Sequence, residues 1–425
     1  MIDPEVRMLV CFVLGGFAGS VANLAIYRFA WKPRDLSPWS PPRNGSLPRR
    51  WHDRIPIFGW LAMRRGVSIY GRGFWIRPMA IELFMATAFA ALYWWEVYVG
   101  GLLLDPVPHV ERVLFAVAAD DRLFHWQVFS HWVLLSLMTV ATFIDVDDQI
   151  IPDKVTVPGT LFALGLASAY PPSLLPGRAL LLPMDPFTEI EFLHITTPQT
   201  WPACLAGGAS NWPVLFLGFA CFSLWCFALL PRAWYSRCGF RKAARYFVAT
   251  ILRDQFSKII FSIWMVGLVA IGLIWRSDGS SWAGLLSSLV GMTGGILMVW
   301  SVRIIGQFVL KKEAMGFGDV TLMGMIGAFV CWQGGLIVFF LAPLAGLVIA
   351  LTQFLLTRNQ LIPYGPFLCL ATVVTVVFWR PIWGFMGERF EAMGAWMPVV
   401  LLACLASMAA LLALLQCVKR LVRRG

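Results

Sequence analysis

Two short acidic motifs are the parts of this sequence whose residue types and spacing could do chemistry. The first, FIDVDDQIIPD, occupies residues 143–153 and directly follows the apolar run 132–144. The second, EAMGFGDV, occupies residues 313–320 and ends where the next apolar run begins. Acidic residues number only 23 of 425. Acids placed beside apolar runs are therefore the first candidates for function.

Asp145 in the first motif and Asp319 in the second are the expected catalytic residues. Two carboxyl groups held close together cannot both ionise easily, so one keeps its proton while the other stays charged. The ionised group can activate a water as general base, and the protonated group can hydrogen-bond the scissile carbonyl and stabilise the developing oxyanion. Such a pair predicts peptide hydrolysis without a metal or a covalent intermediate.

Gly316 and Gly318 support this interpretation, because residues without a Cβ let an extended peptide closely approach the carboxylate of Asp319. A Gly-x-Gly-Asp string alone is more simply the turn at a helix start, with its aspartate as the N-cap. The presence of the first motif favours catalysis over that alternative.

Four further acids are supporting candidates with simpler explanations. Asp147 and Asp148 follow a membrane span, where most acids are solvated. Asp153 follows a proline and precedes an apolar run, so a helix cap is its natural role. Glu82 is a lone acid early in an apolar run, which makes it a functional candidate, although snorkelling of its carboxylate to the membrane interface is the simpler explanation.

The elements that must position these acids are membrane helices. The chain is 59% hydrophobic and 13% charged, which excludes an ordinary water-soluble globule. Because a span needs about 20 mostly apolar residues, we expect an all-α polytopic integral membrane protein with about eleven transmembrane helices. The expected spans are 8–30, 78–103, 126–145, 155–172, 203–230, 259–275, 282–309, 320–333, 335–356, 364–380 and 395–417. The first is expected to be a retained helix rather than a removed signal peptide.

The formal net charge of +11 comes from basic loops and not from a nucleic-acid surface. With eleven spans, the basic segments 32–77, 232–258, 311–312 and 419–424 all fall on one side, which the positive-inside rule makes the cytoplasm. The N-terminus is then outside and the C-terminus cytoplasmic. The segment 231–258 could lie as an amphipathic helix on anionic membrane lipids, or serve only to fix orientation.

A metal site is not expected. The nine cysteines form no Cys-x-x-Cys pair, and the five histidines lack a metal-type spacing such as His-Glu-x-x-His. Most of the cysteines lie within apolar spans, where packing is the better interpretation.

Six segments, in order along the chain, resemble the type IV prepilin peptidases, bacterial relatives of the Gly-x-Gly-Asp intramembrane proteases. The family's leading motif acid matches Asp145, and its Gly-x-Gly-Asp acid matches Asp319. The six segments are GSVANLAIYR (19–28), RIPIFGWL (54–61), RPMAIELF (77–84), IDVDDQIIPD (144–153), EAMGFGDV (313–320) and IPYGPFL (362–368).

The resemblance implies a membrane aspartic endopeptidase that removes the basic leader of prepilins or pseudopilins just after a glycine. The site would face the cytoplasm from the bacterial inner membrane, in service of a type IV pilus, type II secretion or DNA uptake. Many members also N-methylate the new amino terminus with S-adenosylmethionine, so methylation is implied by the resemblance alone. Many carry paired Cys-x-x-Cys motifs associated with zinc, but residues 32–77 contain no cysteine, so zinc is not supported.

The resemblance also organises the chain into segments. Two extra spans between the two aspartates mark 173–280 as an atypical insertion, and an even number of added spans keeps both acids on one face. The expected segments are a first helix (1–31), a basic cytoplasmic loop (32–77), helices with the first motif (78–172), the insertion (173–280), helices with the Gly-x-Gly-Asp motif (281–384) and an extra C-terminal helix with a basic tail (385–425).

Two other function classes remain open. A transporter or channel-like protein could use Asp145 and Asp319 as proton or cation sites, but that class predicts acids near mid-span rather than at span ends. An inactive family member could serve as a scaffold, which the presence of both aspartates and both glycines counts against.

Overall fold

The architecture was examined in a computed structural model and is predominantly helical. It describes residues 3–42, 48–104, 122–181, 188–199, 202–205, 211–230, 245, 249, 253–277, 279–310, 315–356 and 363–422. The expected all-α membrane class is confirmed, with one small two-stranded sheet as an addition. Most of the basic segment 231–258, the pair at 311–312 and the end of the basic tail lie outside the described residues.

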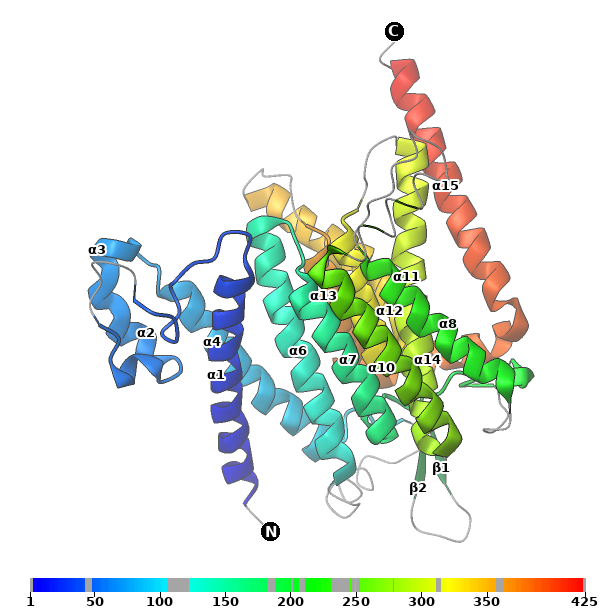
Figure 1. The fold of residues 1–425 in the computed structure, drawn as a ribbon, viewed down its shortest axis with the longest axis horizontal. Helices are drawn as coiled ribbons and strands as arrows, with labels where there is room; N and C mark the ends of the chain where they lie inside the picture. Colours follow the sequence, from blue (N-terminus) through cyan, green and yellow to red (C-terminus); the bar gives the residue numbers. More distant parts are fainter. Residues whose placement is uncertain are drawn as a thin grey trace.

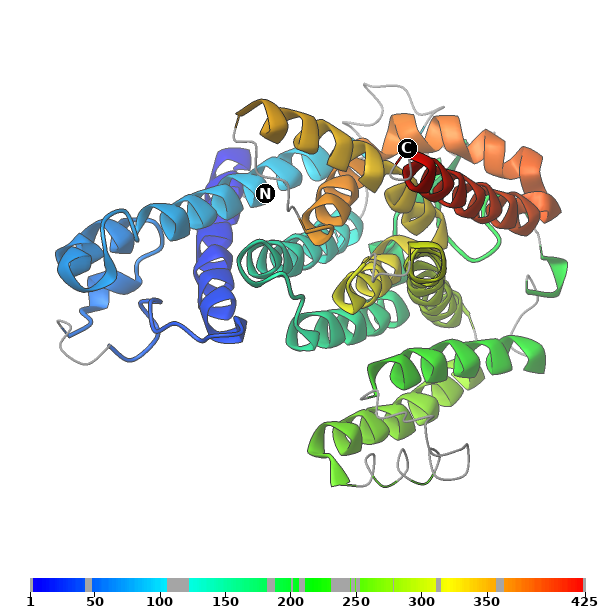
Figure 2. The ribbon, with the colours of Figure 1, turned by 90° about the horizontal axis from the view of Figure 1, so that it is seen from above.

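Long helices form one bundle, shown from the side in Figure 1 and from above in Figure 2. They are α1 (Pro4–Phe29), α4 (Ile76–Tyr93, continued by a π-helical turn over Trp94–Tyr98), α6 (Arg122–Asp148), α7 (Asp153–Ala169), α8 (Trp212–Leu229), α10 (Gln255–Ser277), α11 (Ser280–Leu310), α12 (Phe317–Leu356), α13 (Gly365–Val377), α14 (Trp379–Met393) and α15 (Met397–Val422).

Among the described helices, eight are long and apolar enough to cross a membrane. Two of the remaining expected spans correspond to α7 and α13, which have 17 and 13 residues. At 1.5 Å per residue, α13 is about 20 Å long, short of the roughly 30 Å hydrocarbon layer. The expected spans 320–333 and 335–356 share α12, which breaks at Cys331 with a φ of 60°. The count of eleven and the orientation in the membrane stay predictions.

The centre of the bundle is the pair α11 and α12, against which α7 and α13 pack. Small residues allow the two helices to touch, because a Cβ on Gly327 would lie 2.2 Å from the carbonyl oxygen of Gly291. Within their most apolar windows, 78% of α12 is buried but only 17% of α10. Figure 2 shows α8 and α10 as a pair at the edge of the bundle, so α10 mostly faces the membrane.

An antiparallel hairpin closes the end of the bundle opposite the two acidic motifs (Figure 1). It consists of β1 (Pro176–Leu181) and β2 (Thr188–Phe192). The indole nitrogens of Trp379 and Trp383 donate to the carbonyl oxygens of Pro176 and Gly177, at 2.8 and 2.7 Å. These bonds tie α14 to the hairpin, so the excursion 173–202, expected as an irregular polar segment, is in part ordered structure.

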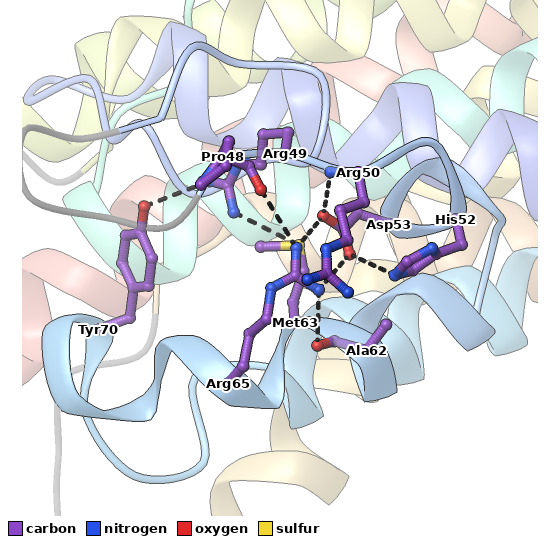
Figure 3. A network of polar contacts seen from close by, with 9 residues as sticks. All are labelled: Pro48, Arg49, Arg50, His52, Asp53, Ala62, Met63, Arg65 and Tyr70. Carbon is purple, nitrogen blue, oxygen red and sulfur yellow. Dashed lines mark hydrogen bonds and ion pairs between the residues drawn. The ribbon is translucent and has the colours of Figure 1, made fainter.

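The basic segment 32–77 folds around one buried acid rather than forming an open loop. It contains α2 (Phe58–Met63) and α3 (Val67–Tyr70). The carboxylate of Asp53 is 1% exposed and accepts both guanidinium nitrogens of Arg65 and, at 2.7 Å, the backbone N–H of Arg50 (Figure 3). Burial pushes the pKa of Asp53 upward, but the Arg65 guanidinium and the Arg50 N–H hold it below its usual value. We call residues 48–77 the Asp53 module.

Candidate active site

Asp145 is positioned by the last turn of α6. Asp145 is 5% exposed, and its carbonyl oxygen accepts the N–H of Gln149 at 2.8 Å, which closes the helix. Gln149 takes a left-handed φ of 56°, and Pro152 then cannot continue the α6 helix. This sharp exit turns the chain back into α7 and leaves Asp145 facing the bundle interior.

Asp319 lies in the first turn of α12 and is 7% exposed. Figure 1 shows α6 ending and α12 beginning at the same end of the bundle. The two motifs also touch, since a Cβ on Gly318 would lie 2.8 Å from the Cβ of Ile151. Gly318 is therefore required for packing between the motifs, a reason different from the expected approach of a peptide. Gly316 is exposed, and a Cβ there would meet only ordinary contacts.

Both carboxyl groups line one cavity of about 400 Å³. Oδ2 of Asp145 is buried and makes no hydrogen bond to the described residues. The backbone of Gly365 lies against this carboxyl group, because a Cβ on Gly365 would be 2.5 Å from Oδ2. The cavity is lined by Asp145, Gln149, Ile150, Ile151, Met315, Gly316, Phe317, Gly318, Asp319, Pro363 and Tyr364.

The electrostatics of this cavity involve three charges. Asp319 interacts electrostatically with Asp145 and with Arg303 of α11. Arg303 is 8% exposed, and its guanidinium carbon lies 5.7 Å from the ring centre of Phe317. Two like charges in a buried site repel, and a nearby guanidinium offsets part of that repulsion. The arrangement can hold one proton between two carboxyl groups, which is what water activation at a carbonyl needs.

A comparison with protein-family models identifies the segment that carries Asp319. Residues 246–351 match the type IV leader peptidase family. The expected resemblance to that family is confirmed. The matched residues include Gly316 and Gly318 but not Asp145, so the assignment of Asp145 rests on the first motif and on the geometry of the shared cavity.

Several curated proteins of this family are similar to parts of the chain. A Pseudomonas aeruginosa protein named prepilin leader peptidase/N-methyltransferase is 30% identical over 134 residues, which are 31% of this chain and 46% of the relative. Proteins of the same name from Stutzerimonas stutzeri and Aeromonas salmonicida are 33% identical over 114 residues and 31% over 111, covering 26% and 23% of the chain and 39% and 38% of the relatives. The chain thus spans less than half of these relatives. No solved structure matches.

The supporting acids of the first motif connect it to its surroundings. Asp147 accepts Arg77 at 2.7 Å, and Asp148 accepts the backbone N–H of Trp31 at 2.7 Å. Neither acid is simply solvated, because both bind the segment that enters or leaves the basic loop. Asp153 is the first residue of α7, where Pro152 is the N-cap and no side-chain capping bond forms.

Glu82 is buried among protein groups, which favours a structural role over snorkelling of its carboxylate to the membrane interface. It is 1% exposed, and its carboxylate accepts the amide of Asn23 at 3.2 Å and the backbone N–H of Ile57 at 2.6 Å. Ile57 has a left-handed φ of 66°, a strained conformation for a β-branched residue. Glu82 therefore holds the strained start of α2, within the Asp53 module, against α1 and α4.

Sequence reasoning missed two parts of the site. Tyr364 and Gly365 belong to the segment 362–368, which matched the family but received no role. Arg303 is a lone cation inside the apolar run 282–309, and the rule that ionisable residues within spans are functional candidates would have singled it out.

A resident metal or cofactor is not assigned. Among the described residues, no group of three or more His, Cys, Asp or Glu side chains could hold a metal ion. In the Asp53 module, the Asp53–Arg65 pair occupies the centre, and a guanidinium and its carboxylate do not form the thiolate set of a structural zinc. No residues are assigned to S-adenosylmethionine.

Proposed function

We propose that this protein is a multi-pass membrane aspartic endopeptidase that removes leaders from prepilin-like proteins, with Asp145 and Asp319 as its catalytic pair. One observation carries the proposal: two buried carboxyl groups from segments 174 residues apart (319 − 145) line the same small cavity. The family match at 246–351 and the printed name of the relatives supply the substrate class. By the distribution of basic loops, the site faces the cytoplasm from the bacterial inner membrane.

The pair would work as one unit. The ionised carboxylate removes a proton from a water whose oxygen attacks the scissile carbonyl carbon, while the protonated carboxyl hydrogen-bonds the carbonyl oxygen. As the tetrahedral intermediate collapses, the C–N bond breaks and the leaving nitrogen takes up a proton. The pair is left with one proton, ready for another cycle.

The position of the acids favours this function over a transporter. Asp145 lies three residues before the end of α6, and Asp319 lies in the first turn of α12. Proton and cation sites of transporters lie near the membrane midplane. Acids at helix ends suit a peptide that approaches from the membrane surface.

The proposal is tested by co-expressing the chain with a prepilin-like substrate and following leader removal by gel shift and N-terminal sequencing. We expect Asp145→Asn and Asp319→Asn each to abolish processing, and Asp3→Asn, at the exposed start of α1, to leave it unchanged. Processing at the wild-type level by both single variants would refute the catalytic pair.

The relatives' printed name adds N-methyltransferase, so the proposal includes methylation of the new amino terminus as a second activity. Mass measurement of the mature substrate tests it, because a methylated N-terminus is heavier by one methyl group. An unmodified N-terminus after complete leader removal would remove this second activity and leave the first intact.

A further inference from the structure

A second cavity adjoins the one that contains Asp145 and Asp319. It has a volume of about 620 Å³ and shares Met315 and Tyr364 with the cavity that contains Asp145 and Asp319. We call this second cavity the lateral groove. Met315 and Tyr364 therefore separate the lateral groove from the cavity of Asp145 and Asp319 by a single layer of side chains.

Three helices build the lateral groove, each with one continuous face. On α15 the lining residues are Leu401, Cys404, Leu405 and Met408, which are spaced three, four and seven positions apart. On α12 they run from Trp332 to Pro343, a length of about 17 Å at 1.5 Å per residue. The α11 wall includes the small residues Gly294 and Ser301.

No lining residue of the lateral groove carries a charge. An occupant of the groove is therefore apolar, and a helix is the form in which an apolar polypeptide satisfies its own backbone hydrogen bonds away from water. Small residues on one wall let a helix approach closely. Met298, Met315 and Met408 have flexible side chains that can fit apolar residues of different shapes.

The α15 wall leaves room for such a helix. Only 6% of the most apolar 18-residue window within Trp379–Leu414, the segment that contains α14 and most of α15, is buried. Figure 1 shows α15 leaning away from the bundle, and it contacts α11. A wall that packs this lightly can adjust to an incoming helix.

We propose that the lateral groove binds the apolar helix of the membrane-inserted substrate, directly beside the peptide bond that Asp145 and Asp319 hydrolyse. This inference rests on the proposed endopeptidase function. The shared residues Met315 and Tyr364 favour a substrate helix over a lipid acyl chain, because a groove that only holds lipid has no need to lie next to the two carboxyl groups.

Cys404 offers a direct test, because its thiol is exposed, free and part of the α15 wall. The full chain in membrane vesicles is combined with substrates that carry a single cysteine at successive positions of the apolar segment, and disulfide formation is induced by oxidation. We expect a crosslinked product at positions about one helical turn apart and no product with Cys404→Ser. Absence of crosslinking at every position would overturn the proposal.

A second experiment blocks the lateral groove with a bulky side chain. Cys404→Trp places bulk inside it, and Ala406→Trp, on the same helix but outside the lining set, is the matched control. We expect Cys404→Trp to slow processing of the membrane-inserted substrate by about tenfold or more. Cleavage of a water-soluble peptide that contains the leader and ends shortly after the cut should be unchanged, which also shows that the variant folds.

The outcomes separate the two proposals. If neither the wild type nor Asp145→Asn cleaves the soluble peptide, the endopeptidase assignment fails, and if both cleave it equally, the catalytic role of Asp145 fails. If the two tryptophan variants process the membrane substrate equally and no crosslink forms, proteolysis stands, the groove holds lipid, and the substrate-helix inference is wrong. If Cys404→Trp loses both processing of the membrane-inserted substrate and cleavage of the soluble peptide, the variant is misfolded, and the crosslinking result alone tests the substrate-helix inference.

Discussion

The catalytic cavity and the Asp53 module each bury aspartate carboxylates, but they satisfy them in opposite ways. Asp53 receives two guanidinium nitrogens and a backbone N–H. Asp145 keeps a buried Oδ2 without a hydrogen bond to the described residues, beside a second carboxyl group. A fully paired buried carboxylate stabilises its surroundings, whereas one that faces a cavity costs stability and is available for chemistry.

The sharpest test of this difference replaces each catalytic carboxyl by an amide. Asp145→Asn and Asp319→Asn should reduce the cleavage rate by about 10²–10⁴-fold or more, because each removes an acid–base group. Neither should lower the melting temperature, since an amide in place of either carboxyl group relieves the unfavourable burial of two ionisable acids side by side. Cleavage rates and thermal unfolding of the purified protein check both. A strongly destabilised but active variant would reverse the roles assigned to the two regions.

The paired carboxylate should behave in the opposite way. Arg65→Ala leaves the buried Asp53 without its guanidinium, which should cost about 2–4 kcal/mol, less than for a fully buried pair because Arg65 is partly exposed. Limited proteolysis of residues 48–77 measures the loss. Arg64→Ala, which removes only a guanidinium above the Trp75 ring, is the matched control. Equal proteolysis of the two variants would contradict a structural role for the pair.

The same pair should make the Asp53 module sensitive to acid. The folded pKa of Asp53 lies below its unfolded value of about 3.9. Its stabilisation is therefore complete above the unfolded pKa and is lost as the pH falls through the folded pKa. The hydrogen-exchange protection of residues 48–77, measured relative to the intrinsic exchange rate at each pH, should fall below about pH 4. In Asp53→Asn, this acid-dependent step should be absent, and a persisting step would assign it to another group.

Arg303 makes the cavity of Asp145 and Asp319 partly similar to the Asp53 module, because it brings a partial counter-charge to the two carboxyl groups. Arg303→Leu should slow cleavage by about tenfold, since the buried negative charge loses its compensation, and Arg303→Lys should retain more of the rate because it keeps the charge. Cleavage rates of the wild type, Arg303→Leu and Arg303→Lys test this prediction. Identical rates for the Leu and Lys variants would show that the charge of Arg303 does not act on the reaction.

The smallest effect is expected at the partly exposed ion pair between Arg77 and Asp147, whose side chains are 38% and 17% exposed. Arg77→Gln should change stability by about 1 kcal/mol or less, and by less still at high salt. Denaturation with and without added salt measures it. A larger loss would mean that this pair, rather than the Asp53–Arg65 pair, secures the module.

The sequence was sufficient for features that depend on local pattern. Apolar runs predicted the helices, and the two motifs identified Asp145 and Asp319, whose catalytic roles stay predictions. It could not show that residues 32–77 fold around Asp53, because the partner of Asp53 lies twelve positions away with no periodic signal. The partners of Glu82 are the Asn23 side chain and the backbone N–H of Ile57, and no sequence pattern predicts either contact. Tyr364 and Gly365 reach the cavity only through tertiary packing.

The break at Cys331 makes α12 mechanically two rods rather than one. The first rod carries Asp319 and is fixed to α11 at the crossing of Gly327 with Gly291. The second rod, from Trp332 onward, forms a wall of the lateral groove. Because the two rods meet at the break at Cys331, the second rod can shift when a helix binds while the first rod keeps the carboxyl group of Asp319 in place. If the proposed function holds, apolar helices of different bulk can bind to the second rod without displacing Asp319 on the first.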